Sequence, residues 1–494
     1  MTMLQDAKSE SIEQVLAYIR DRLPHGKAAM CAAFASEYYR LIAPEDLIER
    51  SPLDLYGAVI AHWNLAQHRA PRECKVRVYT PQLEAHGWQS PHTVIELITD
   101  DMPFLVDSVS MEVTRQGYAI HLIVAPNISV QRDDHGQLLE VFPVEAVQGS
   151  AITEALLHVE VDQQREPAAL DELRQDLVRV LGQVRAAVED WPNMRHILQQ
   201  LVRELEANPP PLDKEEIAEA RDLLAWLDNE NFIFLGYRSY DLLAESGEDR
   251  LGAVPGSSLG ILREAEAGLD AHDIATLPAE VRLLGQSRRL LTLTKADARS
   301  PVHRPSYMDS VGIQRFDATG QVMGEWRFLG LYTTAAYHAH PRDIPVVRHM
   351  FNRVLARAAF LPGDHFYKAL VDILETYPRG ELFQISEDEL FAIVIGILRI
   401  GERPQVRLFL RRDPYGRFLS CLVYLPRDRY HTENRLRIQR ILQQQLHGVN
   451  VEHTAYVTES ILAQLHIIIY TNPDDVPTYD VQAIEKRLTE ATRS

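Results

Sequence analysis

The spacing of apolar residues changes along the chain, and each change predicts a different kind of element. Between residues 11 and 69 apolar positions such as Leu55, Val59 and Trp63 recur every three or four residues, which is typical of helices with one buried face. From Cys74 onward the period shortens to two, and this alternation predicts a β-strand. The chain therefore begins with a helical segment and continues into a sheet.

From the second extended run onward, the predicted order is strand, helix, strand, strand, helix. A second extended run at residues 93–99 is followed by a loop and by a helical pattern that Gly117 ends. The apolar run 119–130, a strand near 156–161 and a helix at 167–189 follow. The order βαββα predicts a ferredoxin-like module.

Three prolines after Asn208 indicate the clearest boundary, because proline stops helices and lacks a backbone donor. Beyond a helix at 214–228, strand-like runs fill 231–336, and a capping box at Ser386 and Glu389 predicts a helix in the region that follows. We therefore predict an α+β, multidomain protein. Its expected domains are a helical segment (1–70), a ferredoxin-like module with C-terminal helices (71–208), a β-rich middle domain (209–340), a helical connector (341–400), a second ferredoxin-like module (401–475) and a linker helix cut off before its natural end (476–494).

Composition and charge narrow the possible partners. With 46% hydrophobic and 24% charged residues, the sequence is that of a folded protein, and its formal net charge of −19 argues against a nucleic-acid partner. The three cysteines follow no metal or disulfide spacing, which favours a reducing compartment. The start of the chain does not have the pattern of a signal peptide, and no apolar run reaches the roughly 20 residues needed to cross a bilayer. We expect a cytoplasmic protein without a membrane partner.

Motifs for catalysis and metal binding carry little weight in this sequence. The run Gly256-Ser257-Ser258-Leu259-Gly260 matches G-x-S-x-G, but a strand is expected after the serine, where a nucleophile elbow needs a helix. No G-x-G-x-x-G or P-loop occurs, and His338 and His340 lack further ligands at zinc spacing. We expect no catalytic residue, no metal and no cofactor site in this chain.

Two segments are candidates for ligand binding. Four cationic side chains could converge on a carboxylate or phosphate, or could form salt bridges between domains: Lys295, Arg299, His303 and Arg304. The second candidate precedes a helix N-terminus, whose unpaired amides favour anions such as an amino-acid carboxylate. It comprises Asp100, Asp101, Met102, Pro103, Phe104 and Leu105, and the alternative is an ordinary strand-to-helix connection.

Several long runs resemble the N-terminal region of the large bacterial NAD-dependent glutamate dehydrogenases. They begin at Thr93 (TVIELITDDMPFLVDSV), Lys295 (KADARSPVHRPSYMD), Arg327 (RFLGLYT), Ile373 (ILETYPR) and Arg411 (RRDPYGRFLSCLVY), and they follow the order of that family. The resemblance implies ACT-type modules and a parent enzyme that converts L-glutamate, NAD and water to 2-oxoglutarate, ammonia and NADH. It also implies a homo-oligomer in which this non-catalytic region regulates a C-terminal catalytic region. NAD would bind in the parent enzyme and not in this part. A purely structural assembly arm without effector binding is the alternative.

The resemblance also bears on the strand-to-helix loop. Amino-acid-binding ACT domains commonly carry Asp-x-Pro-Gly-Leu there, and Asp101, Pro103 and Leu105 match this pattern. Phe104 replaces the glycine that lets the backbone approach a ligand. Whether the cleft is open or filled by this ring decides between an amino-acid effector site and a packing role.

Overall fold

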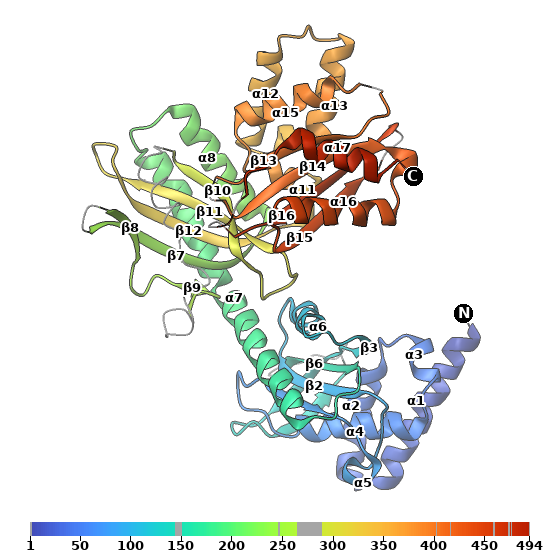
Figure 1. The fold of residues 1–494 in the computed structure, drawn as a ribbon. Coiled ribbons are helices and arrows are strands. Elements are labelled where there is room, and N and C mark those ends of the chain that lie inside the picture. The colour runs from blue at the N-terminus through green and yellow to red at the C-terminus, as the bar shows by residue number, and fades with distance from the viewer. Residues whose placement is uncertain are drawn as a thin grey trace. The chain divides into compact units, whose positions relative to one another are not determined.

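A computed structural model describes the chain at residues 2–143, 151–245, 248–263, 289–401, 403–414, 416–457, 460–472, 475 and 477–493 (Figure 1). The chain forms two compact units. The first contains Met1–Asp190 and the short segment Arg299–Ser306, and the second contains Trp191–Ala298 and Tyr307–Ser494. Each unit combines helices with antiparallel sheets, which confirms the α+β prediction.

The first unit opens with helices, as the apolar period predicts. They are α1 (Thr2–Arg22), α2 (His25–Tyr39), α3 (Pro44–Ile48) and α4 (Pro52–Ala66). Ser51 caps α4 by accepting a hydrogen bond from the Asp54 amide, and Pro52 occupies the first turn, where its missing N–H costs nothing. Apolar residues of these helices form one core with the sheet that follows, including Phe34, Val59 and Leu156.

The sheet of the first unit is six-stranded and antiparallel. Its elements are β1 (Lys75–Tyr79), α5 (Leu83–His86), β2 (Thr93–Asp100), α6 (Leu105–Arg115), β3 (Ile120–Val124), β4 (Asn127–Arg132), β5 (Leu138–Phe142) and β6 (Ile152–Val161). The order is β1-β2-β6-β4-β5, with β3 also paired to β6. The apolar run 119–130 forms β3 and β4, which pair with β6 in the same direction and are separated only by Ala125 and Pro126.

A single long helix leads out of this sheet. α7 (Pro167–Ala207) is 41 residues long and contains Pro192, so the helix expected at 167–189 continues well beyond its expected end. The division between the compact units falls inside α7, after Asp190. The proline run after Asn208 does end the helix, and α8 (Lys214–Trp226) begins at the Asp213 cap.

The second unit contains the β-rich region. β7 (Phe232–Glu245), β8 (Glu248–Ala253), β9 (Leu259–Gly260), β10 (Leu291–Arg299), β11 (Tyr307–Phe316) and β12 (Val322–Tyr332) form a sheet of order β10-β11-β12-β7-β8, with β9 on β7. Gly320, at a φ of 81°, closes the β11–β12 turn with Asp317. A hairpin at this point is what the Asp-Ala-Thr-Gly sequence favours.

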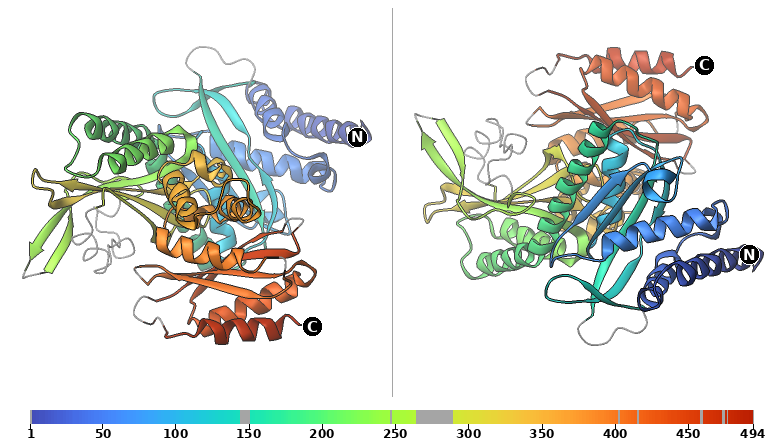
Figure 2. Two further views of the ribbon diagram at one scale, coloured as in Figure 1. Left: turned by 90° about the horizontal axis from the view of Figure 1, so that it is seen from above. Right: turned by 90° about the horizontal axis from the view of Figure 1, so that it is seen from below.

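Short helices and a second sheet, which has four strands, complete this unit. The helices are α11 (Thr334–His338), α12 (Val347–Ala358), α13 (His365–Thr376), α14 (Arg379–Leu382) and α15 (Glu387–Leu398), and the capping box at Ser386 and Glu389 is present. The sheet consists of β13 (Arg407–Arg412), β14 (Phe418–Pro426), β15 (Asn450–Tyr456) and β16 (Leu462–Tyr470) in the order β13-β14-β16-β15. α16 (Thr432–Gln445) and α17 (Val481–Ala491) lie together on one face of it (Figure 2).

Candidate functional site

The loop between β2 and α6 starts from a carboxylate that is held by two arginines. Asp100 Oδ1 accepts a hydrogen bond from Arg69 Nη2 at 2.7 Å, and Asp100 Oδ2 accepts one from Arg185 Nη1 at 2.6 Å. Partial burial acts to raise the pKa of Asp100, but the hydrogen bonds from the two guanidinium groups outweigh it, and the pKa is lowered. Asp100 therefore anchors the loop to β2 and α7 and is already occupied.

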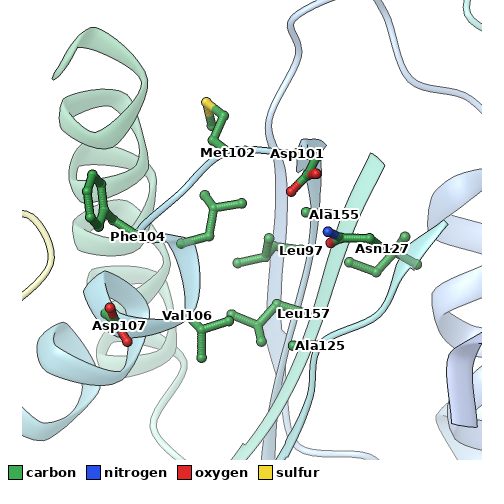
Figure 3. Close-up of a pocket in the computed structure, with 12 residues that line it drawn as sticks. Leu97, Asp101, Met102, Phe104, Val106, Asp107, Ala125, Asn127, Ala155 and Leu157 are labelled. Carbon is green, nitrogen blue, oxygen red and sulfur yellow. The ribbon is translucent and has the colours of Figure 1, made fainter. Parts of the chain in front are cut away.

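Phe104 adopts a left-handed backbone conformation at the start of α6. Its φ is 71°, a region in which a residue with a Cβ is strained and glycine is not. This explains why the related motif carries glycine at this point. The ring of Phe104 points away from Leu97, Leu157 and Asn127 (Figure 3). It therefore does not fill the space beside the loop.

A cavity of about 260 Å³ lies beside the loop between β2 and α6. Its lining comes from the loop and first turn of α6 and from the neighbouring strands β2, β4 and β6. These residues are Leu97, Asp101, Met102, Phe104, Leu105, Val106, Asp107, Ala125, Asn127, Ala155, Leu156 and Leu157 (Figure 3). Four of our six loop candidates line it, whereas Asp100 and Pro103 do not.

Polar groups surround this cavity on two sides. α6 begins beneath it without a side-chain cap, so the amides of its first turn can act as donors. Asp101 and the Asn127 side chain lie next to each other at the opposite edge (Figure 3). The arrangement provides donors for a carboxylate at one end and an acceptor for an ammonium group at the other.

Asn127 and Ala125 are cavity residues that the sequence analysis does not predict. Both lie at the break between β3 and β4, and the continuous apolar run hides this break. The only residues at that break that favour a turn are Pro126 and Asn127. If an interruption of the strand had been predicted there, the start of β4 would have been a candidate neighbour of the loop.

The four cations of the second candidate site are divided between the two compact units. Lys295 lies in the second unit, where its Nζ is 2.6 Å from Asp309 Oδ1, and both side chains are buried. Burial acts to lower the pKa of Lys295, but the charge of Asp309 raises it above its ordinary value. Arg299, His303 and Arg304 lie in the segment that belongs to the first unit.

His303 contacts the helix that borders the cavity. Its Nδ1 is 2.8 Å from Asp107 Oδ2, and its backbone N–H donates to Ser108 Oγ at 3.0 Å. The imidazole also packs against the Phe104 ring, with centroids 5.0 Å apart. The segment Arg299–Ser306 thus fixes the outward position of Phe104 and occupies the carboxylate of Asp107.

The remaining sequence motifs have structural roles. Ser258 of the G-x-S-x-G match is buried, and its Oγ accepts a hydrogen bond from Arg238 Nε at 2.7 Å. His338 Nδ1 lies 2.8 Å from the Thr334 carbonyl, and His340 Nε2 lies 3.0 Å from Glu375. Within the described residues, no three His, Cys, Asp or Glu side chains are grouped as a metal site, and no helix is both long and apolar enough to span a membrane.

Comparisons with known proteins give matches along nearly the whole chain. Three family models match: the glutamate dehydrogenase ACT1 domain over residues 34–177, its helical motif 1 over 344–403 and its ACT2 domain over 407–494. The chain is 38% identical over 491 residues to the NAD-specific glutamate dehydrogenase of Halomonas elongata and 36% identical over 489 residues to that of Pseudomonas aeruginosa. Each match covers 99% of this chain and 30% of the relative.

A third relative is more distant. The NAD-specific glutamate dehydrogenase of Mycobacterium tuberculosis is 29% identical over 450 residues, which is 88% of this chain and 26% of that protein. The chain therefore spans about three tenths of the length of the Halomonas and Pseudomonas relatives.

Proposed function

This chain is related to the NAD-specific glutamate dehydrogenases, and from this premise we propose that it is the regulatory and oligomerisation region of such an enzyme. The parent enzyme would convert L-glutamate, NAD and water to 2-oxoglutarate, ammonia and NADH in the cytoplasm. This region would be non-catalytic, and its partners would be the parent's own C-terminal catalytic region and the other subunits. An amino acid would be its effector.

One observation carries the effector proposal, namely that the cavity beside the β2–α6 loop is open. The replacement of glycine by Phe104 does not close it, because the ring packs outward on His303. We assign the amides at the start of α6 to the effector carboxylate and Asp101 to its ammonium group. The Asn127 amide would contribute a further hydrogen bond, and the apolar walls at Leu97 and Leu157 would contact the effector side chain.

The sheets support a non-catalytic role. A dinucleotide crevice of the Rossmann type forms at the carboxyl ends of parallel strands, next to a glycine-rich turn. Every strand pair whose register is assigned in the described part of the chain is antiparallel. We therefore assign NAD to the part of the parent enzyme that lies outside this chain.

Isothermal titration calorimetry with the twenty amino acids, one at a time, tests the effector proposal. We expect at least one to bind, and we expect Asn127→Ala to weaken it about tenfold, which corresponds to the loss of one hydrogen bond in a confined site. Asn193→Ala is the matched control, since Asn193 is exposed on α7 outside the cavity. An unchanged affinity in Asn127→Ala would remove the cavity from consideration.

A structural assembly arm is the alternative, and the replacement of glycine by Phe104 favours it. Analytical ultracentrifugation of the same chain separates the two. Stable oligomers together with no heat of binding from any amino acid would leave only the structural role. An assay for NADH formation from glutamate and NAD checks the non-catalytic part, and turnover by this chain alone would contradict it.

A further inference from the structure

A second cavity lies on the opposite face of the same sheet. It measures about 300 Å³ and lies between the N-terminal helices, the segment 88–92 that precedes β2, and strands β3 and β6. Its apolar wall includes Ile42, Leu55 and Leu122, which belong to the core shared by the helices and the sheet. A volume of this size is at the lower end of the range for small-molecule sites.

Charged residues interrupt the apolar strands at this face. Glu96 on β2 pairs in register with His158 on β6, and Glu160 is the next residue of β6 on the same side. Their side chains are at most 2% exposed. A buried carboxylate is costly unless a partner neutralises it, so each must serve a purpose that outweighs the lost hydration.

Glu160 is neutralised from the mouth of the cavity. Arg50 Nη1 donates to Glu160 Oε1 at 2.5 Å, and His92 Nδ1 lies 2.9 Å from Glu160 Oε2. Arg50 and His92 are both 25% exposed, so the charge pair connects the buried strand to solvent. Burial acts to raise the pKa of Glu160, but His158 and Arg50 outweigh it, and Glu160 stays ionised.

Hydrogen-bond donors are left over in this cavity. Arg50 uses Nη1 for Glu160, whereas its Nε and Nη2 have no partner among the residues that the structure describes. A ligand that fits must therefore be an acceptor, and a guanidinium edge pairs best with a carboxylate.

We propose that this cavity binds a small organic carboxylate with an aliphatic body. The carboxylate pairs with the unused edge of Arg50, and the aliphatic part lies against Ile42, Leu55 and Leu122. This site is separate from the cavity at the β2–α6 loop, and the proposal does not depend on the effector role given to that loop.

Three probes of similar size separate the contributions of the ligand's carboxylate and amine groups to binding. 4-Methylpentanoate and leucine both carry a carboxylate on the same aliphatic body, and 3-methylbutan-1-amine carries only the amine. We expect calorimetry to show binding of one or both carboxylates and none of the amine. Binding of the amine as tight as that of the acids, or no binding by either acid, would overturn the proposal.

Variants locate the site. Arg50→Met should lower the affinity for the carboxylate at least tenfold. Glu160→Gln should raise this affinity, because it removes a competing negative charge. Arg50→Met alone leaves the buried Glu160 carboxylate without its guanidinium partner. The double variant Arg50→Met/Glu160→Gln removes both charges, and we expect it to fold. It should not bind. A double variant that binds as well as the wild type would contradict the assignment.

Two controls complete the design. Arg40→Met removes an exposed arginine of the same helical segment that pairs with Glu37 outside the cavity, and it should leave the affinity unchanged. Asn127→Ala alters the other cavity and should also have no effect. If Asn127→Ala abolishes carboxylate binding and Arg50→Met does not, the ligand occupies the β2–α6 cavity and the present proposal is wrong.

Discussion

The ring of Phe104 lies 5.0 Å from the imidazole of His303, and the two planes are inclined at 49°. Both residues have left-handed backbones, with φ values of 71° and 72°. Two strained residues thus support each other by side-chain contact, and the Asp107 carboxylate holds the imidazole from the other side. The consequence is an open cavity beside a loop whose sequence left both an open and a filled cleft possible.

This contact predicts the order of stability of two variants. Phe104→Ala keeps the strained φ and loses the ring contact, whereas Phe104→Gly loses the contact but relieves the strain. We expect the glycine variant to be more stable than the alanine variant by about 1 kcal/mol in urea unfolding. Inside a helix the order is the reverse, since alanine is the better helix former. Equal stabilities would show that the left-handed backbone carries no strain.

Much of the fold could be predicted from local chemistry. Ser51 before Pro52, the capping box of Ser386 and Glu389, and the Asp317–Gly320 turn all occur as expected, because each depends on neighbouring residues alone. The apolar pattern predicts helices from residue 11 onward, whereas α1 already begins at Thr2. Local signals thus place elements well but cannot show where a longer helix starts.

The candidate site was only partly predictable. The β2–α6 loop was identified from its position before a helix, but the residues that complete its cavity come from β4 and β6, and only the sheet order brings them near. Lys295 was grouped with His303 because they are close in sequence, yet a buried Asp309 holds Lys295 in the other unit. The buried charges on β2 and β6 were detectable, since Glu96 interrupts an apolar strand.

The buried pair of Glu381 and Arg411 offers a test of the second unit. Arg411 Nε donates to Glu381 Oε2 at 2.7 Å and Nη2 donates to Oε1 at 3.0 Å, and both side chains are at most 3% exposed. Arg411→Met should destabilise the protein by about 3–5 kcal/mol, because a buried carboxylate is left without its partner. The double variant Glu381→Gln/Arg411→Met should be markedly more stable than the single variant.

A double-mutant cycle by urea unfolding measures this coupling. Arg357→Met serves as the control, because its partner Asp388 is 86% exposed and the pair should contribute little. If the double variant is as unstable as Arg411→Met, the instability comes from lost packing and not from the unpaired charge.

Gly57 makes room for Trp88 in the first unit. A Cβ at this position would lie 2.1 Å from Trp88 Cβ and 2.5 Å from Cγ, so the indole would have to move. We expect Gly57→Ala to cost about 1–3 kcal/mol, although alanine is otherwise favoured in a helix. Gly26→Ala is the control, since nothing lies within 4 Å of its Cβ position, and it should stabilise α2 by up to about 1 kcal/mol. Thermal unfolding of both variants gives the comparison, and a neutral Gly57→Ala would contradict the close packing.

His62 should make the first unit sensitive to acid. It is fully buried, its Nε2 lies 3.0 Å from the Leu97 carbonyl, and its Nδ1 accepts from the Tyr38 hydroxyl at 3.1 Å. Since the carbonyl can only accept, the proton of the neutral ring is on Nε2. Burial lowers the pKa of His62 to about 4, and the attraction of Glu96 only partly offsets it, while His158 and Arg77 act in the same direction as burial.

The direction of the pH effect follows from the two states of this ring. The unfolded chain binds the proton near pH 6.5 and the folded chain only near pH 4, so stability falls as the pH drops through this window and does not change above it. Between pH 7 and pH 5 the loss due to His62 should be about 2 kcal/mol. His62→Gln removes this contribution, so its unfolding free energy should change less over the same range, whereas His135→Gln, at an exposed position of the β4–β5 turn, should behave like the wild type. An identical pH dependence in the wild type and in His62→Gln would show that folding does not lower the pKa of this ring.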